Sequence, residues 1–124
     1  MSVPILRRGE LLIATIQSAL SDRGILELRD ELVARVGQFR SRGIVIDVTA
    51  LDVVDSFVAR SLRTIALTAR LRGAETVIVG IQPEVAIALV QLQLDLQPLR
   101  SALDLDEALQ LLRRRTAKRN GDRG

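Results

Sequence analysis

The chain has 124 residues, a net charge of +3 and an apolar fraction of 48%, values typical of one folded domain rather than a disordered chain. It has no cysteine and no histidine, which excludes disulfides, thiolate catalysis and imidazole chemistry and leaves only carboxylates for a metal site. Only two residues are aromatic, so we expect an aliphatic core, and no apolar run approaches the roughly 18 residues needed to span a bilayer.

The positive charge is concentrated at the C-terminal end. Residues 113–124 include six basic residues and one acid, a net charge of +5, so residues 1–112 carry −2. Nucleic-acid binders have a basic stripe on the folded body, often with aromatic residues for stacking, and this body has neither. We therefore expect a domain over residues 1–112, a basic, frayed or disordered tail over 113–124, and neither a nucleic-acid nor a membrane partner. The first residues lack a signal-peptide pattern, which favours a cytoplasmic protein.

The hydrophobic pattern predicts strands that alternate with helices. Five strands are expected, over residues 3–6, 10–16, 44–48, 76–81 and 100–103, and residues 7–9 form the turn between the first two. The first helix begins after a cap at Ser21 or Asp22 and is stopped by Gly43. The other helices are expected over residues 55–71, 83–92 and 104–115.

This order of elements predicts a single small α/β domain, with a mixed, mostly parallel sheet of about five strands and four helices. Crossovers between the parallel strands should be right-handed, and the initial hairpin should add an antiparallel strand. The strand over residues 44–48 is apolar along most of its length, so we expect it at the centre of the sheet, with the helices mainly on one side.

The segment between the third strand and the second helix has two interpretations. In the first, Asp52 and Asp55 resemble a capping box, worth about 1 kcal/mol. In the second, Ser56 accepts a phosphoryl group, because it lies beside unpaired N–H groups at the positive end of a helix. Arg60, one turn later, is placed to reach such a phosphate, and Phe57 is either a core anchor or an exposed recognition residue. Both interpretations stay open on these residues alone.

No standard active site is visible in the sequence. There is no glycine-rich phosphate loop, no dinucleotide fingerprint and no nucleophile elbow. Asp47 ends the central strand, where an aspartyl-phosphate receiver has its acceptor, but residues 13–16 lack the acidic pair that would hold magnesium. A structural, loop-ordering role is therefore favoured for Asp47. We expect no catalytic residue, no metal and no cofactor.

The helix expected over residues 83–92 is apolar on nearly every side. Such a helix is either completely buried or carries an interaction patch. In a domain of this size a patch is favoured, and together with the edge of the first strand it predicts self-association.

Residues 46–57, with the sequence IDVTALDVVDSF, resemble the signature of STAS domains, the module shared by anti-sigma-factor antagonists and sulfate transporter tails. Within that family, Asp55, Ser56 and Phe57 are most similar to the single-domain scaffold subunit of the stressosome. The resemblance extends over the length and element order of residues 3–112, although only the segment around Ser56 is specific. It implies that Ser56 is the phosphoacceptor of a serine/threonine switch kinase.

The resemblance also implies a binding surface and partners. Asp55 and Phe57, with Arg60 and Asp52, would contact the partner, and related STAS co-antagonist proteins would be further partners. The expected function is a non-enzymatic scaffold that sequesters the kinase until Ser56 is phosphorylated. One alternative is a stand-alone anti-sigma-factor antagonist that binds an anti-sigma kinase. Another, of a different class, is a small nucleotide-binding domain or enzyme that uses the loop over residues 47–52.

Overall fold

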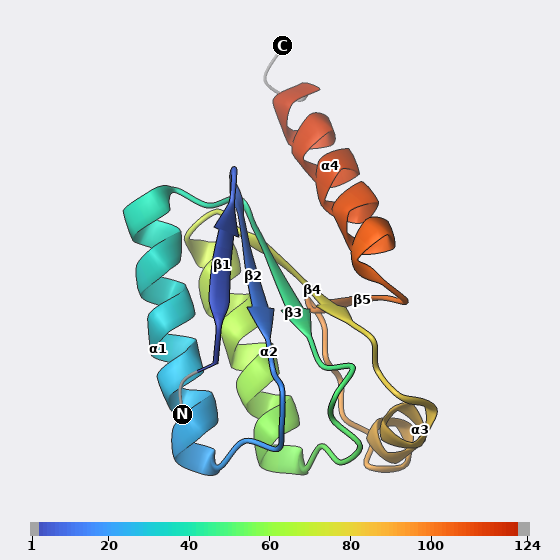
Figure 1. Cartoon of the computed structure of the whole chain (residues 1–124). Coiled ribbons are helices and arrows are strands. Elements are labelled where there is room, and N and C mark those ends of the chain that lie inside the picture. Colours follow the sequence, from blue (N-terminus) through green and yellow to red (C-terminus); the bar gives the residue numbers. More distant parts are fainter. Residues whose placement is uncertain (1–2, 122–124) are drawn as a thin grey trace.

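A computed structural model describes residues 3–121 of the chain (Figure 1). Its strands are β1 (Ile5–Arg8), β2 (Leu11–Thr15), β3 (Gly43–Asp47), β4 (Glu75–Val79) and β5 (Arg100–Ala102). Its helices are α1 (Asp22–Phe39), α2 (Ser56–Leu71), α3 (Pro83–Gln91) and α4 (Leu105–Gly121). The order of elements is the expected one. Over the described residues, no helix is both long and apolar enough to cross a membrane.

The five strands form one sheet in the order β1-β2-β3-β4-β5. Strand β1 is antiparallel to β2, and the other neighbours are parallel, which confirms the expected mixed sheet. The central strand is β3, as expected, and four of its five residues are buried. Its isoleucines and valine alternate between the two faces, so both faces of the sheet need apolar cover at this strand.

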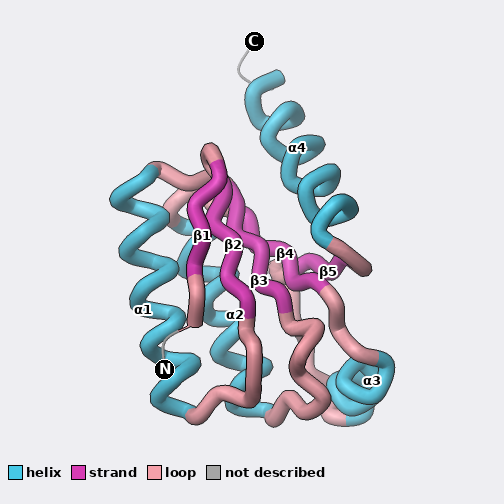
Figure 2. Tube along the Cα trace, viewed as in Figure 1, coloured by secondary structure: helices cyan, strands magenta, loops and turns pink. Residues whose placement is uncertain are grey.

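The two faces of the sheet are covered differently. Helices α1 and α2 pack side by side on one face, where Leu32 and Leu62 meet Ile44 and Ile46 of β3. Helix α4 lies on the opposite face, over a smaller cluster that includes Val45. Figure 2 shows α3 apart from both layers, beyond the carboxyl ends of the parallel strands. The expectation of helices mainly on one side therefore holds only for α1 and α2, because α4 covers the opposite face and α3 covers neither.

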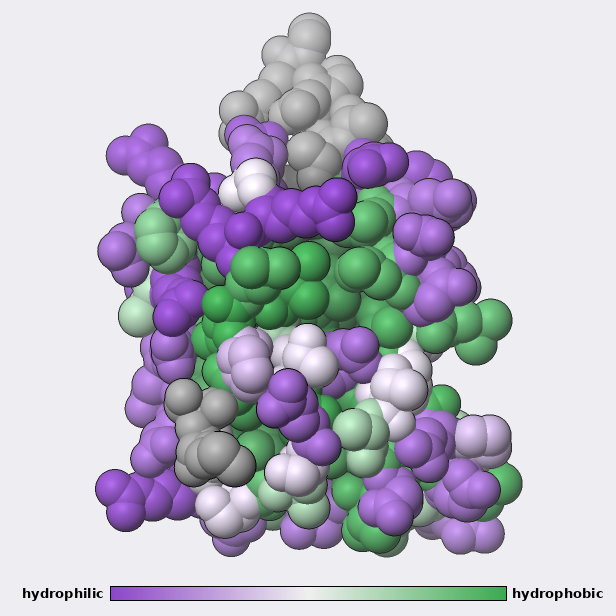
Figure 3. All heavy atoms as spheres, viewed as in Figure 1, coloured by the Kyte–Doolittle hydropathy of each residue, from purple (hydrophilic) through white to green (hydrophobic). Residues whose placement is uncertain are grey.

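Helix α4 covers only part of its face. Leu6 of β1 pairs with Ile13 of β2, and Ile13 with Val45, so the three side chains share that face. Val45 is buried beneath α4, Ile13 is half-buried, and Leu6 is 62% exposed. Figure 3 shows hydrophobic side chains gathered across this face of the molecule.

Several predicted boundaries differ from those observed. Strand β1 lies two residues later than expected, so its turn to β2 is at Gly9 and Glu10, with Gly9 in the left-handed region (φ 59°). Helix α1 is not stopped by Gly43: Arg40 takes the left-handed C-cap conformation, and its N–H donates to the carbonyl of Val36. Gly43 is instead the first residue of β3. A Cβ there would lie 2.6 Å from Leu11 Cδ2, so close packing explains this glycine.

Helix α4 continues to Gly121, beyond the end expected at residue 115. The predicted tail over residues 113–124 therefore begins inside this helix. Its last three residues lie outside the described part of the chain, and the division into domain and tail stays a prediction.

Candidate functional site

The loop that leads from β3 to α2 is held by Asp47. One carboxylate oxygen of Asp47 accepts hydrogen bonds from the backbone N–H of Thr49 at 2.9 Å and from its hydroxyl at 2.6 Å. The carbonyl of Thr49 accepts from the side-chain amide of Gln82 at 2.7 Å, which ties this loop to the one before α3. These bonds give Asp47 a loop-ordering role through one of its two carboxylate oxygens.

Helix α2 begins with Asp55 as its N-cap. The residue is extended (φ −82°, ψ 172°), and its carboxylate accepts from the backbone N–H of Val58 at 2.8 Å. Asp is among the preferred N-cap residues because it satisfies an N–H that the helix leaves without a partner. Asp55 alone therefore provides the cap, and Asp52 makes no capping bond in the structure.

Ser56 is the first residue of α2 and is not used as a cap. Its side chain is half-buried, and its hydroxyl accepts from Arg60 Nη2 at 3.1 Å. Arg60 Nε also donates to the carbonyl of Ser56 at 3.2 Å, which fixes the guanidinium against the first turn. The hydroxyl thus lies between a fixed cation and the positive end of the helix.

Exposed residues flank Ser56 along the chain. Phe57 is 38% exposed and Val53 is 70% exposed, and the carboxylates of Asp52 and Asp55 also face solvent. We call these four residues and Ser56 the Ser56 surface. It combines two large apolar side chains with two carboxylates around one hydroxyl, a composition suited to a protein partner.

The helix that follows α2 and β4 carries a second exposed apolar surface. On α3 and just beyond it, Ile87, Val90 and Leu92 are 57%, 76% and 52% exposed. Only Val85 and Leu89 of this helix are buried. We call the three exposed residues the α3 patch. Its position fits the exposed patch that the sequence favoured over complete burial.

The capping role and the proposed phosphoacceptor role fall on different residues. Asp55 is the cap, while the hydroxyl of Ser56, beside it, accepts from Arg60 and caps nothing in the described part of the chain. The sequence did not reveal the Thr49–Gln82 bond between loops or the exposure of Val53, since neither a lone glutamine nor a single valine carries a positional signal.

Among residues 3–121, no group of three or more acidic side chains could hold a metal ion.

A sequence profile of the STAS domain matches residues 2–108. The chain belongs to the STAS family. This STAS domain is 31% identical over 99 residues to the RsbT co-antagonist protein RsbRA of Bacillus subtilis. The match covers 80% of this chain and 35% of RsbRA, so the chain spans about a third of that relative.

Two solved structures of similar length also match this STAS domain. One is a variant of RsbS from Moorella thermoacetica, 36% identical, with a TM-score of 0.80 and coverage of 93% of this chain and 97% of that one. The other belongs to a study of the architecture of the stressosome, described as a signal integration and transduction hub. It is 34% identical, with a TM-score of 0.73 and coverage of 91% and 98%. The expected STAS resemblance is confirmed.

Proposed function

We propose that this STAS domain is a non-enzymatic scaffold of a cytoplasmic stress-signalling complex of the stressosome type. It sequesters a serine/threonine switch kinase until that kinase phosphorylates Ser56. The observation that carries the proposal is the Ser56 hydroxyl, 3.1 Å from Arg60 Nη2 at the start of α2 and surrounded by exposed residues. Similarity over nearly the whole chain to RsbS and to a stressosome subunit supports the same function.

The first turn of α2 is suited to hold a phosphate. The kinase would transfer the γ-phosphoryl group of ATP to Ser56 Oγ, with ADP leaving and the hydroxyl proton passing to a base on the kinase. The phosphate adds about −1.5 to −2 charge at neutral pH and three acceptor oxygens. Arg60, already bonded to the hydroxyl, donates to these oxygens, and the helix N-terminus favours their charge. The fold should therefore tolerate phosphorylation.

The same phosphate changes the Ser56 surface for a partner. Beside the carboxylates of Asp52 and Asp55 it creates a strongly acidic surface next to Phe57. A kinase that docks on the neutral serine then meets charge repulsion and the cost of desolvating a dianion. The scaffold releases its partner without a change of fold.

Assembly with other STAS proteins is the second part of the proposal. RsbRA, by its name a co-antagonist of RsbT, represents the class of partner expected. The α3 patch supplies apolar area for self-association or for pairing with a related STAS domain, because exposed contiguous apolar residues mark interaction surfaces.

Phosphopeptide mapping after incubation with the partner kinase and ATP tests the switch. Label is expected on Ser56, and Ser56→Ala should keep the kinase bound because the neutral surface survives without an acceptor. Ser56→Asp should weaken binding only in part, since one carboxylate has less charge and fewer oxygens than a phosphate.

Two residues of α2 serve as internal controls. The Ser61 side chain is only 8% exposed, and the Thr64 hydroxyl donates to the carbonyl of Arg60 at 3.0 Å. Both lie deeper in the helix than Ser56. Label on Ser61 or Thr64 with Ser56 unmodified would refute the proposed switch.

The two alternatives make different predictions. A stand-alone anti-sigma-factor antagonist would bind its kinase as a single 13.6 kDa domain, whereas a scaffold forms a much larger particle. Light scattering of the protein, alone and with its STAS partner, separates these cases. A nucleotide-binding domain or enzyme using the loop over residues 47–52 would lose its ligand on Thr49→Val, because the Thr49 hydroxyl orders Asp47.

A further inference from the structure

We propose that a groove beside the second half of α2 binds a small anion that carries two or more phosphate groups. The groove has a volume of about 790 Å³ and lies between α2 and β5. The residues that the proposal uses line it from three segments: Arg63 and Arg70 of α2, Asp95 and Gln97 of the connection after α3, and Arg100 and Ser101 of β5.

The fold leaves this groove open because the edge strand lacks a helix on that face. Helix α2 packs against β4, and α3 lies beyond the carboxyl ends of the strands instead of over β5 (Figures 1 and 2). The chain from α3 therefore reaches β5 through an irregular segment over residues 92–99. Asp95 and residues 97–99 of this segment, rather than a helix, form that wall of the groove.

The groove is positively charged. Arg63 and Arg70 supply two cations and Asp95 one carboxylate, and in the described part of the chain neither of these arginines forms an ion pair. Arg100 borders the groove, but it pairs with Val77, which faces α4, so its side chain is directed to the opposite face of the sheet. Arg63 Nε donates to the carbonyl of Gln97 at 3.0 Å, which orients the guanidinium without neutralising it. The carboxylate of Asp95 accepts from the backbone N–H of Gln97 at 3.0 Å, and its negative charge offsets one of the two cations.

The spacing of the cations favours an extended anion. Arg63 and Arg70 are seven residues apart on one helix, about 10 Å along its axis. Two or three linked phosphates span more of this separation than a single phosphate does. Guanidinium groups are well suited to phosphate oxygens because they donate in pairs. The volume lies within the range of small-molecule sites, which favours a compact ligand over an acidic protein segment.

The groove adds a second binding surface to the helix that carries the Ser56 surface. Ser56, Arg60 and Arg63 lie at spacings of four and three residues, so they follow one side of α2. The ligand contacts proposed here do not include Ser56. Ser56→Ala should therefore leave anion binding unchanged, and the groove does not depend on the phosphorylation switch.

The test is a titration followed by amide chemical shifts in the NMR spectrum of the full chain. The probes are inorganic pyrophosphate, ATP and GTP. We expect saturable shifts at residues 97–101 and around Arg63 and Arg70, which weaken as salt is raised. Equal affinity for pyrophosphate and the nucleotides means that the linked phosphates alone are recognised, and tighter nucleotide binding adds the nucleoside to the ligand; both support the proposal.

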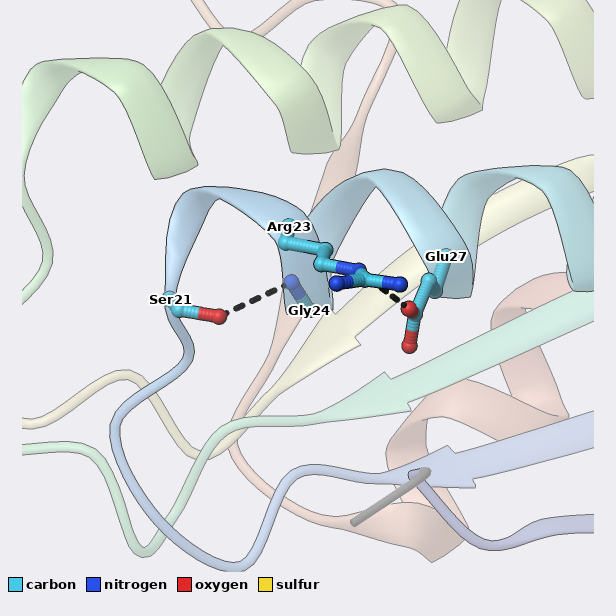
Figure 4. Close-up of polar contacts among 4 residues, drawn as sticks. All are labelled: Ser21, Arg23, Gly24 and Glu27. Carbon is cyan, nitrogen blue, oxygen red and sulfur yellow. Dashed lines mark hydrogen bonds and ion pairs between the residues drawn. The ribbon is translucent and has the colours of Figure 1, made fainter.

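The double variant Arg63→Gln/Arg70→Gln should bind these probes at least about tenfold more weakly. Arg23→Gln is the matched control, because Arg23 is also exposed but lies on α1, paired with Glu27 at 3.1 Å (Figure 4). The proposal is overturned by absent shifts at about 5 mM pyrophosphate and nucleotide, a range of very weak binding. It is also overturned by equal losses in Arg23→Gln, or by binding of a polyglutamate peptide that pyrophosphate does not displace.

Discussion

Replacing Asp55 separates its role as a helix cap from its proposed role in recognition. Asp55→Ala removes the oxygen that accepts from Val58 N–H at 2.8 Å, and loss of an N-cap costs about 1 kcal/mol, within a range of roughly 0.5–2. Asp55→Asn keeps an acceptor of the same shape and ranks with Asp as a cap. It should lose only the charge–dipole term, roughly 0.3–1 kcal/mol in the first turn.

These energies convert into measurable melting temperatures. For 124 residues, an unfolding entropy of about 2.1 cal/mol/K per residue makes 1 kcal/mol equivalent to roughly 4 °C. Thermal unfolding followed by circular dichroism should thus place Asp55→Ala roughly 4 °C below the parent, within a range of roughly 2–8 °C, and Asp55→Asn closer to the parent, roughly 1–4 °C below it. If the two variants melt together, the capping bond is not what stabilises the start of α2.

Kinase binding supplies the other half of the comparison. If the kinase contacts the Asp55 carboxylate, Asp55→Asn should weaken kinase binding while the stability of the domain stays near normal. If only Asp55→Ala binds the kinase more weakly, the loss comes from the destabilised start of α2. The Asp55 carboxylate then does not contact the kinase.

Four other variants test assembly and local structure. Ile87→Glu places a charge in the α3 patch, where the side chain is 57% exposed, and should shrink the complex in light scattering without lowering the melting temperature; an unchanged particle argues against this surface. Gly80→Ala should destabilise by about 1–3 kcal/mol, because Gly80 has φ 79° and a Cβ there would collide with Thr49, and a melting temperature equal to the parent's would contradict this packing. Ser21→Ala should cost about 1 kcal/mol through the lost α1 cap seen in Figure 4, whereas Arg23→Ala, in an exposed ion pair, should cost less than about 0.5; the reverse order in thermal unfolding would refute it.

The order and type of the elements followed from the sequence because strong local signals agree with the final packing. The apolar run of β3 required burial on both faces, and that requirement put it at the sheet centre. Boundaries failed where a residue had two possible uses. Glycine often ends a helix, which is why the sequence predicts Gly43 as the stop of α1. In the structure Arg40 adopts the left-handed cap conformation, and Gly43 is required because a side chain there would collide with Leu11 and Leu112.

The candidate site was predictable in its residues but not in its contacts. The spacing of Ser56 and Arg60 predicts contact across one helical turn, and the structure has that bond. The sequence did not show whether Asp52 or Asp55 caps α2, because both carboxylates lie near the start of the helix and only the geometry of the loop distinguishes them. The arginine groove has no sequence pattern, since one wall comes from α2 and the other from residues 95–101, at least 25 residues later (95 − 70), and the two meet only after β5 joins the sheet.

The register of the sheet has a consequence for how the chain folds. Leu11 pairs with Gly43, and Gly43 with Glu75, so both central crossovers advance by 32 residues (43 − 11 and 75 − 43). In the described sheet, only the β1–β2 hairpin pairs residues that are close in sequence. Each parallel pair must first close a long loop, at an entropic cost. Folding should therefore be limited by the arrival of β3 between its two neighbours, with the hairpin forming early and contributing little to the rate.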